Sequence, residues 1–130
     1  MKRPSRKTLI RNLDIAVREL VFKRDKACVT CPIWREIRPN WNGSDIMQPG
    51  HVFTRGNYST RWDLRNIYKQ CKTCNFMHEL QPWALIGYAK GVLGDKGFDK
   101  LFFDTNQAKP IKDWELQELL TRLTSGSNIS

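Results

Sequence analysis

The cysteines of this chain form two C-x-x-C pairs, and this spacing constrains the fold more than any other feature. The pairs are Cys28 with Cys31 and Cys71 with Cys74, and the chain has no other cysteine. Two such pairs can supply four thiolates to a tetrahedral zinc ion. Two local redox disulfides or an iron–sulfur cluster are the alternatives. With zinc bound, the 39 residues between the pairs would be closed into a loop.

Three polar residues in or beside this loop are candidates for a shared site. They are His51, Asn66 and Asn75, and a zinc clip would bring them within reach of one another. A histidine suits general base catalysis because its pKa lies near neutrality. An amide oxygen at the start of a helix, where we expect Asn75, suits a hard divalent cation. We expect Asn66 to fasten the loop by hydrogen bonds. Each residue alone also fits an ordinary role: a surface histidine, a turn asparagine, a helix cap.

The charge balance indicates a polyanionic partner. The chain has 22 Lys and Arg against 13 Asp and Glu, a net charge of +9 and a pI of about 9.7. Nucleic acid is the polyanion that best fits this balance, and a well-solvated basic surface is the plainer interpretation. No segment has the composition of a membrane span or a signal peptide, so we expect a soluble, cytoplasmic protein.

At 130 residues the chain is expected to form one domain with short appendages. We expect residues 1–11 to be a basic flexible N-terminus and residues 12–81 to be a zinc-stapled core. Residues 82–124 are expected to form a helical region packed on the core, and residues 125–130 a disordered tail.

Apolar periodicity predicts a helix over residues 12–26, with Asn12 as its N-cap, before the first cysteine pair. Strand-like content follows over 32–37 and 46–53. The second strand carries His51, and Pro49-Gly50 predicts a bulge in it. Loops are expected between these strands and after the second one, and a short helix over 74–80.

Three more helices are predicted in the C-terminal part. The first covers 83–93 and is ended by Gly94, the second covers 96–106, and the third covers 112–123. We expect the apolar side chains of the second helix to face inward: Phe98, Leu101, Phe102 and Phe103. In the third helix the apolar residues lie along one side: Trp114, Leu116, Leu119, Leu120 and Leu123. The apolar face of the last helix is also a candidate homodimer surface.

Three segments of the chain resemble the HNH, or ββα-metal, nuclease signature. They are Pro49–Gly56 (PGHVFTRG), Arg61–Asn66 (RWDLRN) and Gln70–Asn75 (QCKTCN). More narrowly, they resemble the phage NinG/Rap recombination-nuclease family. The resemblance covers roughly residues 23–123, and only its motif core is specific.

This resemblance implies an α+β fold with a small zinc-stapled ββα-metal core. It implies that His51 is the general base, Asn66 the middle asparagine and Asn75 a ligand of a catalytic Mg²⁺ or Mn²⁺. The four cysteines would hold a structural zinc apart from the chemistry. The implied activity is endonucleolytic cleavage of DNA, with branched recombination intermediates as the substrate class.

One position departs from the broader HNH pattern. Many members place an acidic or histidine metal ligand directly before the general base, where this chain has Gly50. Asp63 is the first candidate for the missing ligand, because it lies in the closed loop. His78 and Glu79 follow, since they share a helix face with Asn75, and Asp45 is a distant option.

The basic residues near the motif are expected to contact phosphates on either side of the cut. They are Arg55, Arg61, Arg65, Lys69 and Lys72.

Other functions remain open at this level. A non-catalytic zinc module that binds DNA fits Gly50 and the positive charge. A sequence-specific homing nuclease or a packaging nuclease would carry the same motif. A protein-interaction domain, with the zinc as scaffold and the C-terminal helices as docking surface, is the weakest alternative.

Overall fold

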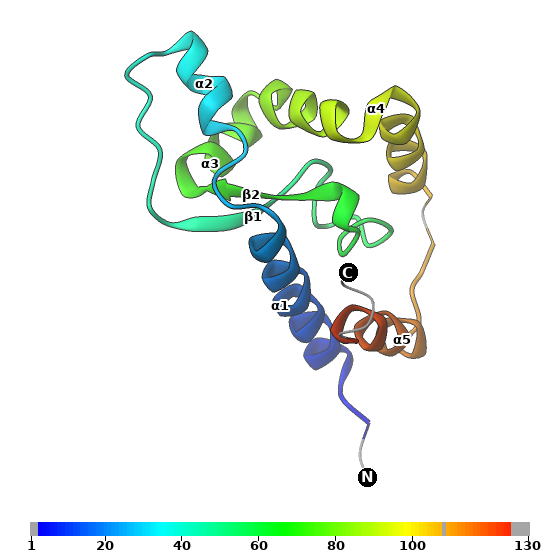
Figure 1. Cartoon of the computed structure of the whole chain (residues 1–130). Coiled ribbons are helices and arrows are strands. Elements are labelled where there is room, and N and C mark those ends of the chain that lie inside the picture. The colour runs from blue at the N-terminus through cyan, green and yellow to red at the C-terminus, as the bar shows by residue number, and fades with distance from the viewer. Residues whose placement is uncertain (1–2, 108, 126–130) are drawn as a thin grey trace.

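The computed structural model describes residues 3–107 and 109–125, and over these it has a mostly helical α+β fold (Figure 1). Its two strands form one antiparallel sheet, and helices surround it. The elements in chain order are α1 (Arg6–Arg24), α2 (Cys31–Ile37), β1 (Met47–His51), the 3-10 helix η1 (Leu64–Asn66), β2 (Ile67–Cys71), α3 (Lys72–Leu80), α4 (Trp83–Thr105) and α5 (Asp113–Thr124).

The sheet and α3 form the unit that carries the candidate site. β1 pairs with β2 in an unbroken register that runs from Met47 opposite Cys71 to His51 opposite Ile67. β2 passes directly into α3, whose N-cap is Cys71. His51 therefore ends one strand while the second cysteine pair begins the helix after the other.

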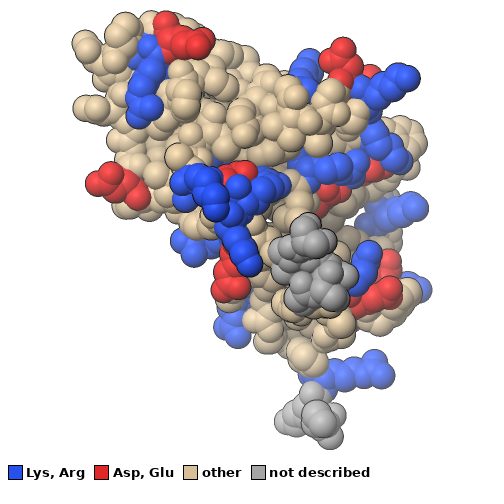
Figure 2. All heavy atoms as spheres, viewed as in Figure 1, with Lys and Arg blue, Asp and Glu red and all other residues tan. Residues whose placement is uncertain are grey.

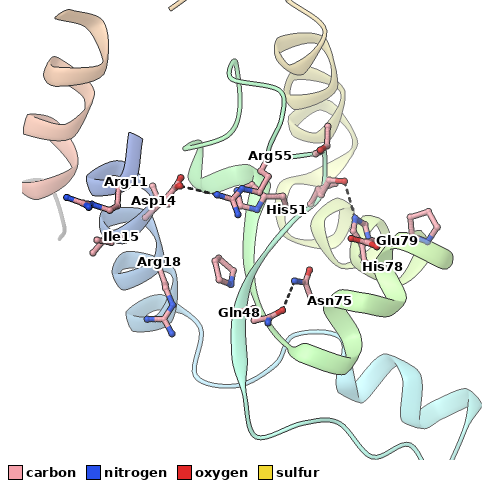
Figure 3. Close-up of a pocket in the computed structure, with 15 residues that line it drawn as sticks. Arg11, Asp14, Ile15, Arg18, Gln48, His51, Arg55, Asn75, His78 and Glu79 are labelled. Atoms are coloured by element: carbon pink, nitrogen blue, oxygen red, sulfur yellow. Dashed lines mark hydrogen bonds and ion pairs between the residues drawn. The ribbon is translucent and has the colours of Figure 1, made fainter. Parts of the chain in front are cut away.

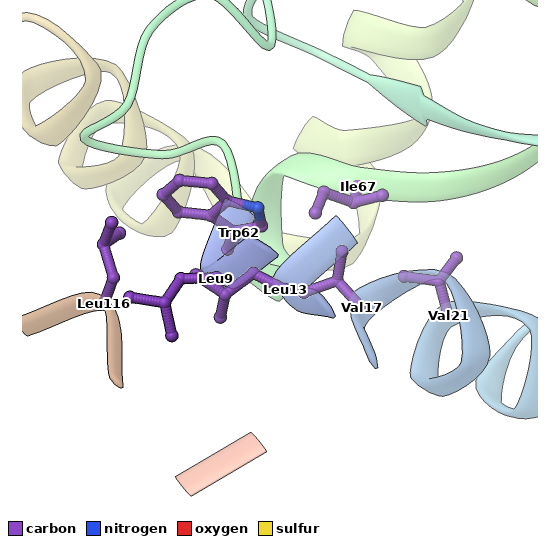
Figure 4. Close-up of a cluster of buried hydrophobic side chains, with 7 residues drawn as sticks. All are labelled: Leu9, Leu13, Val17, Val21, Trp62, Ile67 and Leu116. Carbon is purple, nitrogen blue, oxygen red and sulfur yellow. The ribbon is translucent and has the colours of Figure 1, made fainter. Parts of the chain in front are cut away.

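The main hydrophobic core lies between α1, α5 and the hairpin (Figure 4). Apolar residues recur along α1 at spacings of three to four, so they share one face of the helix. This face packs on side chains from the loop, from β2 and from α5. The buried members are Leu9, Leu13, Val17, Val21, Trp62, Ile67 and Leu116.

α1 begins earlier than its apolar periodicity predicts. Ser5 is the N-cap, and its hydroxyl accepts a hydrogen bond from the N–H of Thr8. Residues 6–11, predicted to be flexible, are thus helical, and Asn12 lies inside the helix rather than at its cap. Of the predicted disordered tail, residues 126–130 lie outside the described part of the chain.

The strand predicted over 32–37 is wrong, because this segment is the helix α2. Its β-branched and aromatic residues favour a strand, but Pro32 stands at the first turn of a helix, where its missing N–H costs nothing. Trp34 then packs against the cysteines with 2% of its surface exposed.

The strand predicted over 46–53 exists, but its bulge does not. Pro49 is tolerated without one because each strand of a two-stranded sheet has an unpaired edge. The partner strand β2 was not predicted. Gln70 is buried in it along with Ile67 and Tyr68, so its sequence lacks the apolar and polar alternation of a half-exposed strand.

The predicted C-terminal helices are present. Gly94, with a φ of 73°, interrupts α4 between the two predicted segments. Phe98 and Leu101 are buried as expected, whereas Phe102 and Phe103 are exposed, as is Trp114 on α5.

The rest of the apolar face of α5 packs on the core beside α1 and is not free for a second copy of the chain. Its residues in this contact are Leu116, Leu119, Leu120 and Leu123. Within the described residues, no helix is long and apolar enough to cross a membrane.

Candidate functional site

The four cysteines converge on one buried point. Their sulfur atoms all lie within 4.8 Å of one another. The Sγ of Cys31 is 3.6 Å from that of Cys71 and 3.5 Å from that of Cys74. These separations exceed the S–S bond length of a disulfide, about 2.05 Å. A tetrahedral zinc with bonds of about 2.3 Å would place its sulfurs about 3.8 Å apart, so this set fits the ion.

Local backbone structure holds each cysteine pair. The N–H of Val29, inside the first pair, donates to the carbonyl of Lys69 on β2 at 2.9 Å. In the second pair the N–H of Cys74 donates to the Sγ of Cys71. The loop before β1 closes over the cluster, because a Cβ on Gly43 would lie 2.7 Å from the Sγ of Cys31.

The packed thiols also show why a cation is favourable here. A hydrogen bond from Cys74 lowers the pKa of Cys28 to about 4. Burial raises the pKa of Cys31 to about 11. A divalent cation bound by the four sulfurs would stabilise the ionised form of each of them.

A pocket of about 740 Å³ lies on the side of the sheet that carries His51 (Figure 3). Figure 3 shows α1 on one side of this pocket, α3 on the other and β1 between them. His51 and Asn75 both line it, so the fold brings together two of the three residues expected to share a site. The third, Asn66, does not line the pocket.

The ring of His51 is held in one tautomer. Its Nε2 lies 3.0 Å from the carbonyl oxygen of Arg61, and a carbonyl can only accept, so Nε2 carries the proton. Nδ1 is therefore the basic nitrogen of the neutral ring. Burial, followed by the charges of Arg55 and Arg61, lowers the pKa of His51 from its usual 6.5. The neutral form able to accept a proton thus predominates at pH 7.

Asn66 fastens the loop after β1, as its position led us to expect. Its side chain is fully buried. The Oδ1 accepts from the N–H of Phe53 at 2.8 Å, while the Nδ2 donates to the carbonyls of Phe53 and Thr60 at 3.0 and 3.1 Å. Since Phe53 is two residues beyond His51, these bonds fix the course of the chain directly after it.

Asn75 and His78 present unused acceptor atoms near the pocket. The Nδ2 of Asn75 donates to Gln48 at 2.8 Å, so this bond leaves its Oδ1 free to accept. The Nε2 of His78 contacts the carbonyl of Val52 at 3.2 Å, which places the ring proton there. The Nδ1 of His78 is buried and has no hydrogen-bond partner within the described residues.

The other ligand candidates differ in position. Glu79 lines the pocket. Asp63 does not: its carboxylate caps η1 and pairs with Arg65 at 2.6 Å, so it is a poor candidate for a ligand. Asp45, in the loop before β1, does not line the pocket either. A side chain at Gly50 would displace the buried Gln70, since its Cβ would lie 2.0 Å from the Oε1 of Gln70.

The basic residues expected to contact DNA are mostly engaged within the protein. Arg61 binds Asp14, and Arg65 bridges Asp63 and Asp104. The Nζ of Lys69 lies over the ring of Phe22, 5.2 Å from its centroid. Lys72 is exposed but does not line the pocket, so of the five residues only Arg55 does.

Three charged residues of α1 that line the pocket were not predicted from the sequence: Arg11, Asp14 and Arg18. Asp14 accepts hydrogen bonds from the side chains of Arg61 at 2.7 Å and Trp62 at 2.8 Å, and so ties α1 to the loop that holds His51. The spacing of the three residues does predict a common helix face. Nothing in the sequence indicated that this face lies opposite His51.

Neither protein-family models, nor curated proteins, nor solved structures give a match to this chain.

Proposed function

We propose that this protein is a metal-dependent DNA endonuclease of the HNH type. The observation that carries the proposal is the setting of His51. Its tautomer is fixed by the Arg61 carbonyl, its pKa is lowered by burial, and it shares one pocket with Asn75. These are the properties that a general base needs to take a proton from water at neutral pH.

Asn75 and His78 are the residues that would hold a divalent cation. The amide oxygen of Asn75 suits Mg²⁺ or Mn²⁺. His78 has the arrangement common among metal-binding histidines, in which one ring nitrogen donates to a backbone carbonyl and the other is left for the metal. Glu79, on the same helix and also in the pocket, is the next candidate. The bound cation would stabilise the negative charge that develops on the phosphate.

The rest of the fold supports this proposal. β1, β2 and α3 follow one another in the order that the term ββα-metal describes. We assign zinc to the four cysteines, where it would fix the start of α3, and therefore Asn75, relative to the sheet. The net charge of +9 favours DNA as substrate, and Figure 2 shows Lys and Arg side chains gathered where the end of α1 meets the strands. We propose branched recombination intermediates as the substrate class because of the resemblance to NinG/Rap nucleases.

The test is cleavage of labelled linear, flapped and four-way DNA with Mg²⁺ or Mn²⁺ by the zinc-loaded protein. His51→Ala should lower the rate by at least about 100-fold, the contribution of one general base. Zinc content, melting temperature and DNA affinity should stay the same. Cleavage that persists at the original rate in His51→Ala would remove the assignment.

His78→Ala distinguishes the role of a metal ligand, proposed for His78, from that of the general base, proposed for His51. Loss of a ligand should weaken metal binding by at least the roughly 10–100-fold that loss of a ligand's hydrogen-bond partner costs, so higher Mn²⁺ should restore part of the rate. Added metal should not restore His51→Ala. Substitution of Asn42, an exposed loop residue outside the pocket, provides the control and should leave cleavage unchanged.

A non-catalytic DNA-binding module is the second candidate. It is favoured by one observation: within the described residues, the cysteines are the only group of three or more His, Cys, Asp or Glu side chains close enough to hold a metal ion. This alternative predicts salt-sensitive DNA binding with no metal-dependent cleavage at any protein concentration.

A further inference from the structure

The outer face of α1 forms one wall of the His51 pocket. Arg11, Ile15 and Arg18 line it, and their spacings of four and three residues place them in one row along the helix. The opposite face of α1 is buried in the core. The row is therefore fixed in direction by the packing of the whole helix. In Figure 3 Asp14 points from α1 toward Arg55, whereas Arg11 and Ile15 extend on the side of the helix turned away from His51, so the row borders the pocket at its rim.

The two arginines in this row carry positive charge that the protein does not neutralise. Within the described residues, neither Arg11 nor Arg18 makes a salt bridge. Arg18 lies over the ring of Phe22, 4.5 Å from its centroid, an arrangement that leaves its in-plane N–H donors available. The acid next to them, Asp14, is already paired with Arg61 and Arg55.

The dimensions of the row match a nucleic-acid strand. Arg18 lies seven positions after Arg11 along the helix, about 10 Å along the axis. A strand that rises about 3.4 Å per nucleotide covers this length in about three steps. Ile15, with 49% of its surface exposed, lies between the two guanidinium groups and offers an apolar contact for the sugars.

We propose that Arg11, Ile15 and Arg18 bind the sugar–phosphate backbone of the DNA strand that enters the pocket, and so hold it over His51. This rests on the proposed function, because it names the DNA path into that same site. The contact with the DNA strand is thus assigned to α1, whereas the sequence analysis expected it mainly from basic residues of the loop after β1 and of β2.

The test measures DNA affinity by fluorescence anisotropy in a His51→Ala background, so that the DNA stays intact. Each phosphate contact changes the slope of log K against log salt by about 0.9 and is worth about 8-fold at 0.1 M salt. Arg11→Gln with Arg18→Gln should therefore weaken binding by about 60-fold and reduce the slope by about 1.8. Arg11→Lys with Arg18→Lys keeps both charges, so it should keep the slope and most of the affinity.

Lys90→Gln with Lys96→Gln is the matched control. Both lysines are exposed on α4 and lie outside the pocket, and their removal lowers the charge by the same amount. A loss of DNA affinity as large in this control as in the arginine variant would overturn the inference. Unchanged affinity in the arginine variant would do so too, as would a failure of the His51→Ala protein itself to bind DNA at low salt. Circular dichroism should show both variants folded, since all four residues are exposed.

The two proposals fail separately. If the protein cleaves DNA through His51 but the arginine variant binds normally, the α1 path is wrong and the nuclease stands. If the arginine variant alone loses binding but the wild-type protein never cleaves, the α1 path stands and the nuclease falls.

Discussion

Replacing Asn66 with alanine should destabilise the protein severely, because one side chain holds the loop after His51 in place. The substitution removes three hydrogen bonds from a fully buried residue. At about 1 kcal/mol each they sum to about 3 kcal/mol, and the Phe53 N–H would also lose its acceptor. A domain of this kind has a total stability of about 5–15 kcal/mol, so the loss is a large fraction of it.

Asn66→Asp should be worse than Asn66→Ala. It would place a carboxylate against two carbonyl oxygens that now accept from the Nδ2, those of Phe53 and Thr60. Burial would raise the folded-state pKa of the introduced carboxyl above its unfolded value. Its penalty is then present at neutral pH and relieved as the pH falls through that raised pKa.

Urea unfolding, followed by tryptophan fluorescence with zinc at a fixed concentration, gives the free energies. Asn42→Ala is the control, because Asn42 is exposed and should change stability by less than about 0.5 kcal/mol. If Asn66→Ala behaved like this control, the loop would not depend on the Asn66 bonds. Equal stability of the aspartate and alanine variants would contradict the assigned direction of the amide.

Three further predictions concern the cysteine cluster, His51 and the glycine before it. Chelation of zinc, or Cys71→Ser, should release the metal and unfold the region around α3, seen as loss of zinc by elemental analysis and of cooperative thermal melting. In the pH profile of kcat/KM for cleavage, the acid limb should have its midpoint below pH 6.5, because the pKa of His51 is lowered. Arg55→Gln should move this midpoint to higher pH, since the charge of Arg55 contributes to the lowering. Gly50→Ala should lower the free energy of unfolding by about 1–3 kcal/mol, because the added methyl group overpacks against Gln70. In a double-mutant cycle, Gln70→Ala should recover much of this loss. Additive losses in the two single variants and the double variant would show that the side chains at positions 50 and 70 do not meet.

The cysteine cluster was predictable because it depends on a local signal. The C-x-x-C spacing places two sulfurs on one turn wherever it occurs. A helix break at Gly94 was predictable for the same reason, since glycine adopts a positive φ at little cost. Such features need no knowledge of which elements pack together.

The errors arose where packing outweighs local preference. Trp34 and its neighbours favour a strand, yet the segment is a helix that covers the cysteines. β2 escaped detection because Gln70 is buried beside apolar residues. The exposure of Phe102 likewise could not follow from a helical period, which shows that residues share a face but does not show how wide the buried face is.

The sequence by itself determined the identity and order of the chemical groups: four cysteines, a histidine between the two pairs, Asn66, Asn75 and an excess of positive charge. Only the tertiary structure decided which groups meet. It sets His51 against the carbonyl of Arg61, turns Arg61 and Arg65 to internal acids, and brings Arg11 and Arg18 of a distant helix to the same pocket. The physical reason is that side-chain chemistry belongs to the residue, whereas the partner of each charge is chosen by how the helices and strands bury their apolar faces.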